Sequence, residues 1–249
     1  FSEQMEDISY GRYPDGSANW GNLSTPSPGT ANQMDPSTIN VPSDYPTIQA
    51  ALNTVVDGDT VLVAAGTYVE NIIWPATNGI KLIGIDESTT VIDGGQNASV
   101  IRFEDNENFV IDTTTIIQYL TITNGYAQGD WPAYYGGGIY CGTNASPKLS
   151  NVSIINNHAY WSGGGIYCES SDPVFVNLNI SNNTTSTNMP SGSGGGAVIR
   201  NSNAVFRNCL FNDNLAGSAG GIQCDSNTNP IISGCAITNN TGGGIQVQG

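Results

Sequence analysis

Eight aromatic residues lie close together in the middle of the sequence, within residues 126–167. Trp131 and Tyr160–Trp161 each precede a run of three glycines and so occupy equivalent loops. Aromatic faces pack against the C–H faces of sugars, and neighbouring carboxylates hydrogen-bond to sugar hydroxyls. The alternative is that the rings only cover the corner glycines and one another. We predict an exposed sugar-binding platform that comprises Asp130, Trp131, Tyr134, Tyr135, Tyr140, Tyr160, Trp161, Tyr167 and Glu169.

Four charged residues are candidates for a reaction on a polysaccharide. A lyase needs a base and a cation that neutralises a carboxylate, and we expect Lys148 and Arg207 two repeats apart on one sheet, about 10 Å from each other. A hydrolase needs two carboxylates beside the sugar bond. Glu169 and Asp225 each follow a cysteine, with Arg200 in the corresponding region of the repeat between them. This pattern predicts either a Glu–Arg–Asp line at a reaction site or a ladder of surface charges.

The charge balance excludes two classes of partner. The chain has 6 Lys and Arg against 21 Asp and Glu, for a net charge of −15. Nucleic-acid phosphates need clustered cations, and anionic membrane surfaces attract basic segments. No stretch approaches the roughly 20 apolar residues of a membrane span. We therefore predict neither nucleic-acid binding nor membrane insertion.

A repeated pattern of glycine, apolar and asparagine residues predicts the fold. Glycines followed by mostly apolar residues recur at 136–141, 163–168, 194–199, 220–224 and 243–247. A second, largely apolar line recurs at 149–154, 175–180, 206–211 and 232–237. Each copy of the second line is followed by an Asn-rich turn. Repeats of this length are typical of solenoids, in which successive copies stack.

Each repeat is interpreted as one coil of three short strands. Ile139 and Cys141 are expected to point inward and Tyr140 outward, because side chains alternate along a strand. Asn151 is expected to form a bend, since Asn tolerates the left-handed conformation. The resulting fold is all-β, a right-handed parallel β-helix. A sandwich would not keep one line of side chains in register through four copies.

Cysteine, histidine and acidic residues show no spacing typical of a metal site. No zinc spacing occurs, and the single His158 has no evident partner for a nucleophile. Asp130 and the turn at 104–107 carry oxygen ligands that could bind Ca²⁺, without EF-hand spacing. We predict no resident metal and no cofactor, with Ca²⁺ as the one ion left open. The cysteines are expected inside the coils, with Cys141 beside Cys168, Cys209 beside Cys235, and Cys224 beside no other cysteine.

The first part of the chain differs in composition from the rest. Residues 1–40 are predicted to be a linker or the end of a preceding domain, and residues 41–249 the β-helix. At the start of the second part, Ile48, Ala51 and Leu52 have helical spacing, and Thr47 is a suitable N-cap. We expect a short helix there to cover the open first coil.

Two segments resemble known families. Residues 46–73, with Thr47-Ile48-Gln49-Ala50-Ala51 and Gly66-Thr67-Tyr68, look like the N-terminal cap of the pectin-lyase-like β-helix superfamily. The Gly-Gly-Gly-Ile repeat is similar to that of secreted bacterial β-helix repeat proteins. The pectin-lyase-like superfamily includes polysaccharide lyases, glycoside hydrolases, pectin methylesterases and non-catalytic surface proteins. The catalytic motifs of the methylesterases do not occur here, so we do not expect an esterase.

Residues 8–20 and 24–32 resemble the closing strand and exit segment of bacterial lamin-tail domains. This resemblance implies a modular parent protein. The high Asn and low charge content favour an extracellular or cell-surface location. The chain stops at Gly249 within a predicted coil, so we expect either further residues or copies that stack end to end.

Three hypotheses for function follow from the sequence. The first is a secreted β-helix domain that interacts with polysaccharide or cell-surface glycan through the aromatic platform. The second is a non-catalytic adhesin, stalk or fibre module. The third is a polysaccharide lyase or glycoside hydrolase, and whether the protein is an enzyme stays open.

Overall fold

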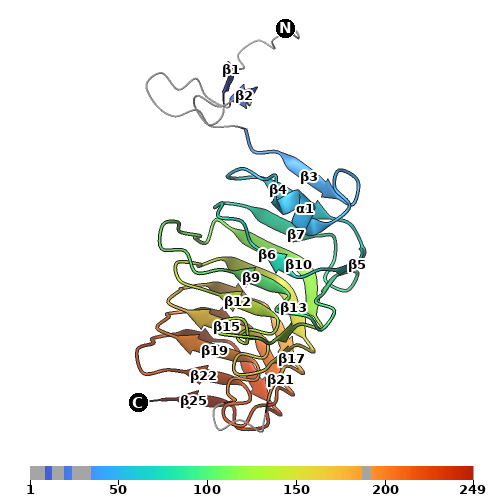
Figure 1. Ribbon diagram of the computed structural model, residues 1–249. Coiled ribbons are helices and arrows are strands. Elements are labelled where there is room, and N and C mark those ends of the chain that lie inside the picture. Colours follow the sequence, from blue (N-terminus) through green and yellow to red (C-terminus); the bar gives the residue numbers. More distant parts are fainter. Residues whose placement is uncertain (1–8, 13–19, 24–34, 187–191, 249) are drawn as a thin grey trace.

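The chain winds into stacked coils of short strands that run parallel from coil to coil (Figure 1). The computed structural model describes residues 9–12, 20–23, 35–186 and 192–248. The predicted right-handed parallel β-helix is confirmed. No helix in these described ranges is both long and apolar enough to cross a membrane.

The strands of the stacked coils form three sheets, which run along the β-helix. Sheet I begins with β3 (Thr38–Val41), β4 (Thr60–Val63), β5 (Gly66–Val69), β7 (Lys81–Gly84), β8 (Thr90–Asp93), β10 (Ile116–Thr123) and β13 (Lys148–Ile155). It continues with β16 (Val174–Val176), β17 (Asn179–Ser181), β20 (Val205–Arg207), β21 (Leu210–Asn212), β23 (Ile231–Ser233) and β24 (Ala236–Thr238). Sheet II comprises β6 (Ile72–Ile73), β9 (Ile101–Phe103), β12 (Ile139–Cys141), β15 (Ile166–Glu169), β19 (Ala197–Arg200), β22 (Ile222–Cys224) and β25 (Ile245–Val247). Sheet III comprises β11 (Tyr126–Ala127), β14 (His158–Ala159) and β18 (Thr184–Thr185).

Sheet I is bent along its length by residues in the left-handed conformation. Asn151 has φ 53°, and the positions stacked on it, Asn177 and Asn208, both have φ 54°. Asn enters this region more readily than most residues because its short side chain can hydrogen-bond locally. The predicted bend at Asn151 is therefore confirmed, and it explains why asparagine recurs in this line.

The interior is filled by apolar columns that run along the axis. Ile139 pairs in register with Ile166, and both are fully buried. Phe175 and Phe206 stack at 4.7 Å between ring centroids in the column from sheet I. Stacking like side chains lets each coil bury the apolar face of the next, which is the main source of solenoid stability.

A column of buried asparagines lies at the turn after sheet I. Asn157 donates from Nδ2 to Oδ1 of Asn183 at 3.0 Å, and Asn183 donates likewise to Asn214 at 3.1 Å. Asn214 continues the column to Asn240 at 2.9 Å. Each Oδ1 also accepts the backbone N–H of the preceding asparagine. The Asn-rich turns of the sequence therefore build a continuous hydrogen-bonded ladder.

The short helix α1 (Ile48–Leu52) covers the first coil as predicted. Its residues Ile48, Ala51 and Leu52 are fully buried, and Thr47 accepts the N–H of Ala50 at 3.1 Å as N-cap. Glu70 accepts the N–H groups of Ile48 and Gln49, both at 2.9 Å. These bonds satisfy N–H groups that the helix itself leaves unpaired.

The N-terminal segment is described only in part. β1 (Ser9–Arg12) and β2 (Trp20–Leu23) form an antiparallel pair. Residue 8 and ranges 13–19 and 24–32, which carry most of the lamin-tail resemblance, lie outside the described residues. Strand β3 already pairs with β4, so sheet I begins a few residues before the predicted boundary at 41. The division into two domains stays a prediction.

The cysteines lie where the stacking predicts. Cys141 pairs in register with Cys168, and the N–H of Cys209 donates to Sγ of Cys235 at 3.4 Å. Cys224 stacks on Ile199 and has no cysteine in register. All five are free thiols. Burial raises the pKa of Cys209 to about 12, so this thiol stays protonated at neutral pH.

Candidate functional site

The predicted exposed aromatic platform is wrong for three of its residues. Tyr140 and Tyr167 point away from the interior as predicted, but they are only 1% and 2% exposed. Tyr135 stacks on Tyr167 with ring centroids 4.3 Å apart, and Tyr134 and Trp161 pack around this cluster. The loop before the glycines therefore folds over the outer face of sheet II. For these residues the alternative holds, because the rings cover one another.

The buried rings form a stacked column on the outer face of sheet II. Arg102 lies with Cζ 4.1 Å from the ring centroid of Tyr140, and the parallel rings of Tyr140 and Tyr167 lie 5.8 Å apart. The phenol of Tyr140 donates to Asp105 at 3.2 Å, and that of Tyr167 donates to Glu169 at 3.0 Å. Burial raises the pKa of both phenols, which therefore remain neutral donors.

The other platform residues differ in how far solvent reaches them. Trp131 is 69% exposed and Tyr160 38% exposed, and Asp130 is exposed beside Trp131. Tyr134 and Trp161 are half-buried, with ring centroids 5.8 Å apart. Trp161 therefore packs against the tyrosine cluster and is also partly exposed to solvent.

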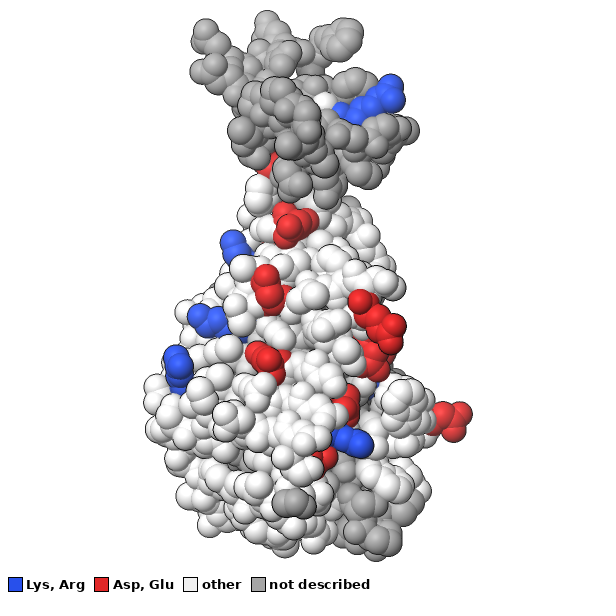
Figure 2. All heavy atoms as spheres, turned by 90° about the vertical axis from the view of Figure 1, so that its left-hand side faces the viewer, with Lys and Arg blue, Asp and Glu red and all other residues white. Residues whose placement is uncertain are grey.

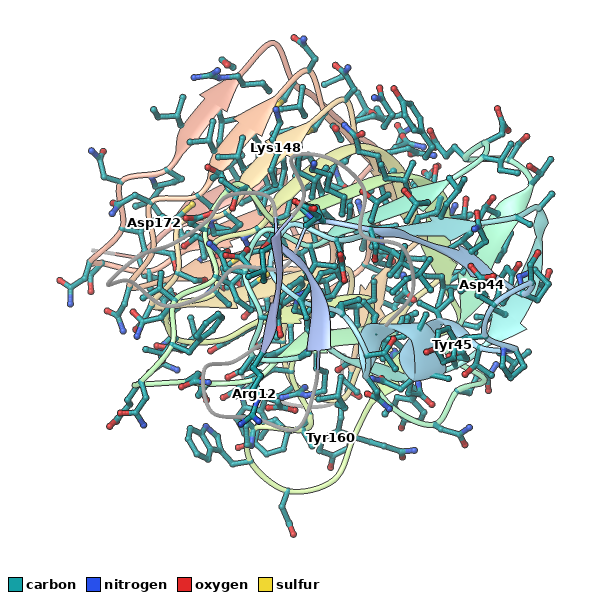
Figure 3. All side chains as sticks on the ribbon, turned by 90° about the horizontal axis from the view of Figure 1, so that it is seen from above. Arg12, Asp44, Tyr45, Lys148, Tyr160 and Asp172 are labelled. Atoms are coloured by element: carbon teal, nitrogen blue, oxygen red, sulfur yellow. The ribbon has the colours of Figure 1, made fainter. Side chains whose placement is uncertain are left out.

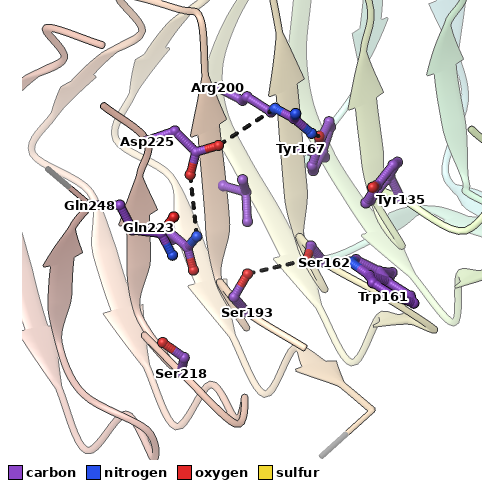
Figure 4. A pocket seen from close by; sticks show the side chains of 11 residues that line it. Tyr135, Trp161, Ser162, Tyr167, Ser193, Arg200, Ser218, Gln223, Asp225 and Gln248 are labelled. Carbon is purple, nitrogen blue, oxygen red and sulfur yellow. Dashed lines mark hydrogen bonds and ion pairs between the residues drawn. The ribbon is translucent and has the colours of Figure 1, made fainter. Parts of the chain in front are cut away.

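An open groove of about 330 Å³ begins where the aromatic column ends (Figure 4). Tyr135, Trp161 and Tyr167 form one end of it, and Val198 and Gln223 form its floor on the next two coils. Val198 and Gln223 are the outward residues of β19 and β22, in register with Tyr140 and Tyr167. The groove thus crosses successive coils along the helix axis.

One side of the groove is a column of serines. Ser162, Ser193 and Ser218 follow one another through parallel bridges between coils. Oγ of Ser162 lies 3.1 Å from Oγ of Ser193, and Ser218 donates to Gln246. These hydroxyls can each donate and accept hydrogen bonds at the groove edge.

The structure forms the predicted Glu–Arg–Asp line: Arg200 and Asp225 lie on the opposite side of the groove, and Glu169 contacts Arg200 from outside the lining. Nε of Arg200 lies 3.6 Å from Oε2 of Glu169 and 3.5 Å from Oδ2 of Asp225. Arg200 also donates to the phenol of Tyr167 at 3.5 Å. Its side chain is 47% exposed, so these ion pairs contribute little to stability. Within the described lining the charges of Arg200 and Asp225 balance each other, and Glu169 adds a negative charge beside Arg200.

The predicted pair of cations lies on a different side of the coil. Lys148 stacks through Val174 on Val205, two residues before Arg207, which agrees with the predicted register. Both belong to sheet I, and Lys148 and Tyr160 lie on opposite sides in the view from above (Figure 3). Neither cation forms an ion pair within the described residues. The structure therefore does not join them to the groove.

Positive charge is sparse over the whole surface. Figure 2 shows the Lys and Arg residues of one face separated from one another, with one of them beside acidic residues. The six cations of the chain face 21 carboxylates. No blue patch gathers on this face that could bind a polyanion.

Asp105 and His158 have structural partners within the protein. Among the described residues, no three Asp, Glu, His or Cys side chains gather as a metal site would require. In the turn at 104–107, Asp105 accepts from Tyr140 and from the N–H of Thr143. His158 contacts Thr184 at 2.7 Å through Nδ1, and burial lowers its pKa.

Sequence reasoning missed the floor of the groove. Val198 and Gln223 occupy the same outward position as Tyr140 and Tyr167, which the repeat makes visible in the sequence. Neither residue is aromatic or charged, so the residue types used to predict the site did not indicate them.

Comparisons with known proteins identify relatives in fold. A family described as "Right handed beta helix region" matches residues 67–249. The chain is similar to a pectin methylesterase solved in complex with hexasaccharide VII, at 12% identity and a TM-score of 0.41, with 81% of this chain and 82% of that chain covered. Pectin methylesterase PemA from Erwinia chrysanthemi gives 12% identity, a TM-score of 0.41 and coverage of 81% and 82%. No curated protein matches the chain.

Proposed function

The chain belongs to the right handed beta helix region family, and from this premise we propose that it binds a polysaccharide or cell-surface glycan in the groove on sheet II. The observation that carries the proposal is the groove itself, which is open, about 330 Å³ in volume and built from several coils. Successive coils lie about 4.8 Å apart, so the walls present similar groups at regular intervals. A chain of repeated sugar units suits such a surface.

The chemistry of the walls supports this proposal. The indole of Trp161 borders the groove and offers an aromatic face to sugar C–H groups. The serine column, Gln223 and Asp225 offer hydroxyl, amide and carboxylate groups to sugar hydroxyls. An apolar end with a few convergent polar groups is the usual composition of a ligand site.

The geometry favours binding over catalysis. A glycosidase holds the sugar bond between its two carboxylates, but the guanidinium of Arg200 contacts both Glu169 and Asp225. Lys148 and Arg207 lie on sheet I, away from these carboxylates. A shared site for a lyase or hydrolase therefore has no support from these four residues.

An extracellular or cell-surface location and a modular parent protein are part of the proposal. They are supported by the low charge, by the Asn-rich composition and by the resemblance of residues 8–32 to a lamin-tail domain. End-to-end assembly of coils is the competing role, in which the β-helix only provides length.

A glycan microarray tests the proposed function. We expect the wild-type protein to bind a defined set of glycans, and Trp161→Ala to lose at least nine-tenths of that signal because its ring borders the groove. Trp131→Ala is the matched control, since Trp131 is exposed but does not line the groove. Equal loss in both variants, or no glycan bound by the wild type, would contradict the proposal. An ultraviolet assay for unsaturated products, run in parallel, would reveal a lyase.

A further inference from the structure

We propose that the groove selects neutral sugars over acidic ones, and that Oε1 of Gln223 receives a hydrogen bond from a sugar hydroxyl. This inference rests on the proposed function, because it names the class of glycan that the same groove takes. Three features of the groove support this inference. They are the unpaired oxygen of Gln223, the compensated charge of Arg200, and the uncharged side chains of the remaining lining.

The first feature is the side-chain oxygen of Gln223. Gln223 is only 6% exposed, and its Nε2 donates to Oδ1 of Asp225 at 3.2 Å. A carboxylate can only accept, so this bond fixes the amide with its nitrogen toward Asp225. Oε1 then points away from Asp225 toward the serine side of the groove (Figure 4). Among the described residues, no group donates to this oxygen.

A buried acceptor without a donor costs free energy in the absence of a ligand. The cost arises because the acceptor has lost its hydrogen bonds to water and has gained none from the protein. A hydroxyl group that donates to Oε1 would remove this cost, which gives the ligand affinity and selects for a donor. Sugar hydroxyls are donors, whereas an ionised carboxylate is only an acceptor and would repel this oxygen.

The second feature is the charge of Arg200. Among the described residues that line the groove, Arg200 is the cation, and its charge is already paired. Its Nε lies within 3.6 Å of two carboxylates, those of Glu169 and Asp225. A uronate needs a cation that is not already compensated. The two carboxylates already compensate the guanidinium, so the described lining offers an acidic sugar no uncompensated cation. The net charge of −15 adds repulsion over a longer range.

The third feature is the remaining lining, which carries no charge. Val198 lies on the floor beside Gln223, and Ser193 and Ser218 follow along one side. The apolar side chain of Val198 can contact the C–H face of a sugar, and the serine hydroxyls can donate to or accept from its hydroxyl groups. These apolar and hydroxyl groups therefore complement the surface of an uncharged sugar.

Isothermal titration with a matched panel of oligosaccharides tests the inference. The neutral probes are hexasaccharides of glucose, xylose, mannose and galactose, and the acidic probes are hexagalacturonate, hexaguluronate and hexamannuronate. We expect at least one neutral probe to bind, with an affinity that stays constant between 50 and 300 mM salt because no ion pair forms. We expect every acidic probe to bind at least ten-fold more weakly.

Gln223→Met tests the role of the oxygen itself. Methionine keeps the length of the side chain and removes the acceptor, so the affinity for the neutral probe should fall at least ten-fold. Gln118→Met is the matched control, because Gln118 lies in β10 of sheet I and bonds to Ser150 outside the groove. Circular dichroism of both variants confirms that each is folded.

The outcomes separate this inference from the proposed function. Binding of acidic probes alone, with dependence on Trp161, would overturn the neutral selectivity and leave glycan binding in place. Neutral binding that is unchanged in Gln223→Met would overturn the role of Oε1. A protein that binds no probe here and no glycan on the microarray would overturn the proposed function and this inference together.

Discussion

Two buried side-chain amides in this β-helix have opposite hydrogen-bonding states. In the asparagine ladder, Oδ1 of Asn183 accepts from both the N–H and the Nδ2 of Asn157. Its Nδ2 donates to Asn214 and to the carbonyl of Ile154. In the groove, Gln223 donates once to Asp225, and its Oε1 has no donor among the described residues.

The difference separates a structural amide from an amide that can bind a ligand. Every polar atom of the ladder finds its partner in the coil above or below, so the ladder holds the coils in register. Gln223 has one partner inside the protein and one atom left for a molecule outside it. Both amides are buried, so burial does not distinguish them. They differ in whether the amide oxygen has a hydrogen-bond donor.

The largest expected effect is on the ladder. Asn183→Leu should lower the free energy of unfolding by about 3–9 kcal/mol, because two donors of Asn157 and the carbonyl of Ile154 lose their partner at about 1–3 kcal/mol each. Urea unfolding followed by circular dichroism measures this change. Asn229→Ala, at an exposed position, is the control and should stay within about 0.5 kcal/mol of wild type. A loss below about 1 kcal/mol for Asn183→Leu would mean that the ladder does not hold the coils.

The effect of Gln223→Met on stability should be much smaller. Removing the amide loses one bond to Asp225 but also removes an unpaired buried acceptor, so the two changes offset each other. We expect an unfolding free energy within about 1 kcal/mol of wild type. The same urea experiment applies. A loss as large as that of Asn183→Leu would show that Gln223 is a structural residue and would remove the contrast.

The smallest expected effect is a pH dependence at the corner beside the ladder. His158 follows Asn157, and burial lowers its pKa below the ordinary value of 6.5. The folded state therefore binds this proton less readily than the unfolded state, so stability falls as pH drops through about 6.5. We expect the urea midpoint to decrease between pH 7 and pH 5.5.

His158→Gln is the control for this effect, because the chain contains no other histidine. In that variant the midpoint should be flat over the same interval. An equal decrease in both proteins would assign the pH dependence to another group.

The repeat allowed the coil to be predicted in detail. Alternation along the strand correctly directed Ile139 and Cys141 inward and Tyr140 outward, because a period of two follows from strand geometry alone. The neighbouring cysteines and the Glu169–Arg200–Asp225 line followed from counting positions after each glycine run. These are properties of register, which a repeated sequence displays openly.

The exposure of an outward-pointing residue could not be predicted from the repeat. Tyr140 and Tyr167 are buried because Tyr134–Tyr135 and Trp161 fold over them, and the path of such a loop depends on packing between coils. In the coil that carries Gln223, the residues before the glycines, 216–219, are all small, and Ser218 and Gln223 both line the groove. Outward position is a local property, whereas exposure depends on loops from neighbouring coils.

A crystal structure of the protein with the tightest-binding neutral hexasaccharide would show whether the ligand lies in the groove on sheet II. We expect a sugar ring over Val198, a hydroxyl within hydrogen-bonding distance of Oε1 of Gln223, and the indole of Trp161 at the edge of the ligand. A sugar bound elsewhere, such as against Trp131, with the groove left open, would contradict this expectation.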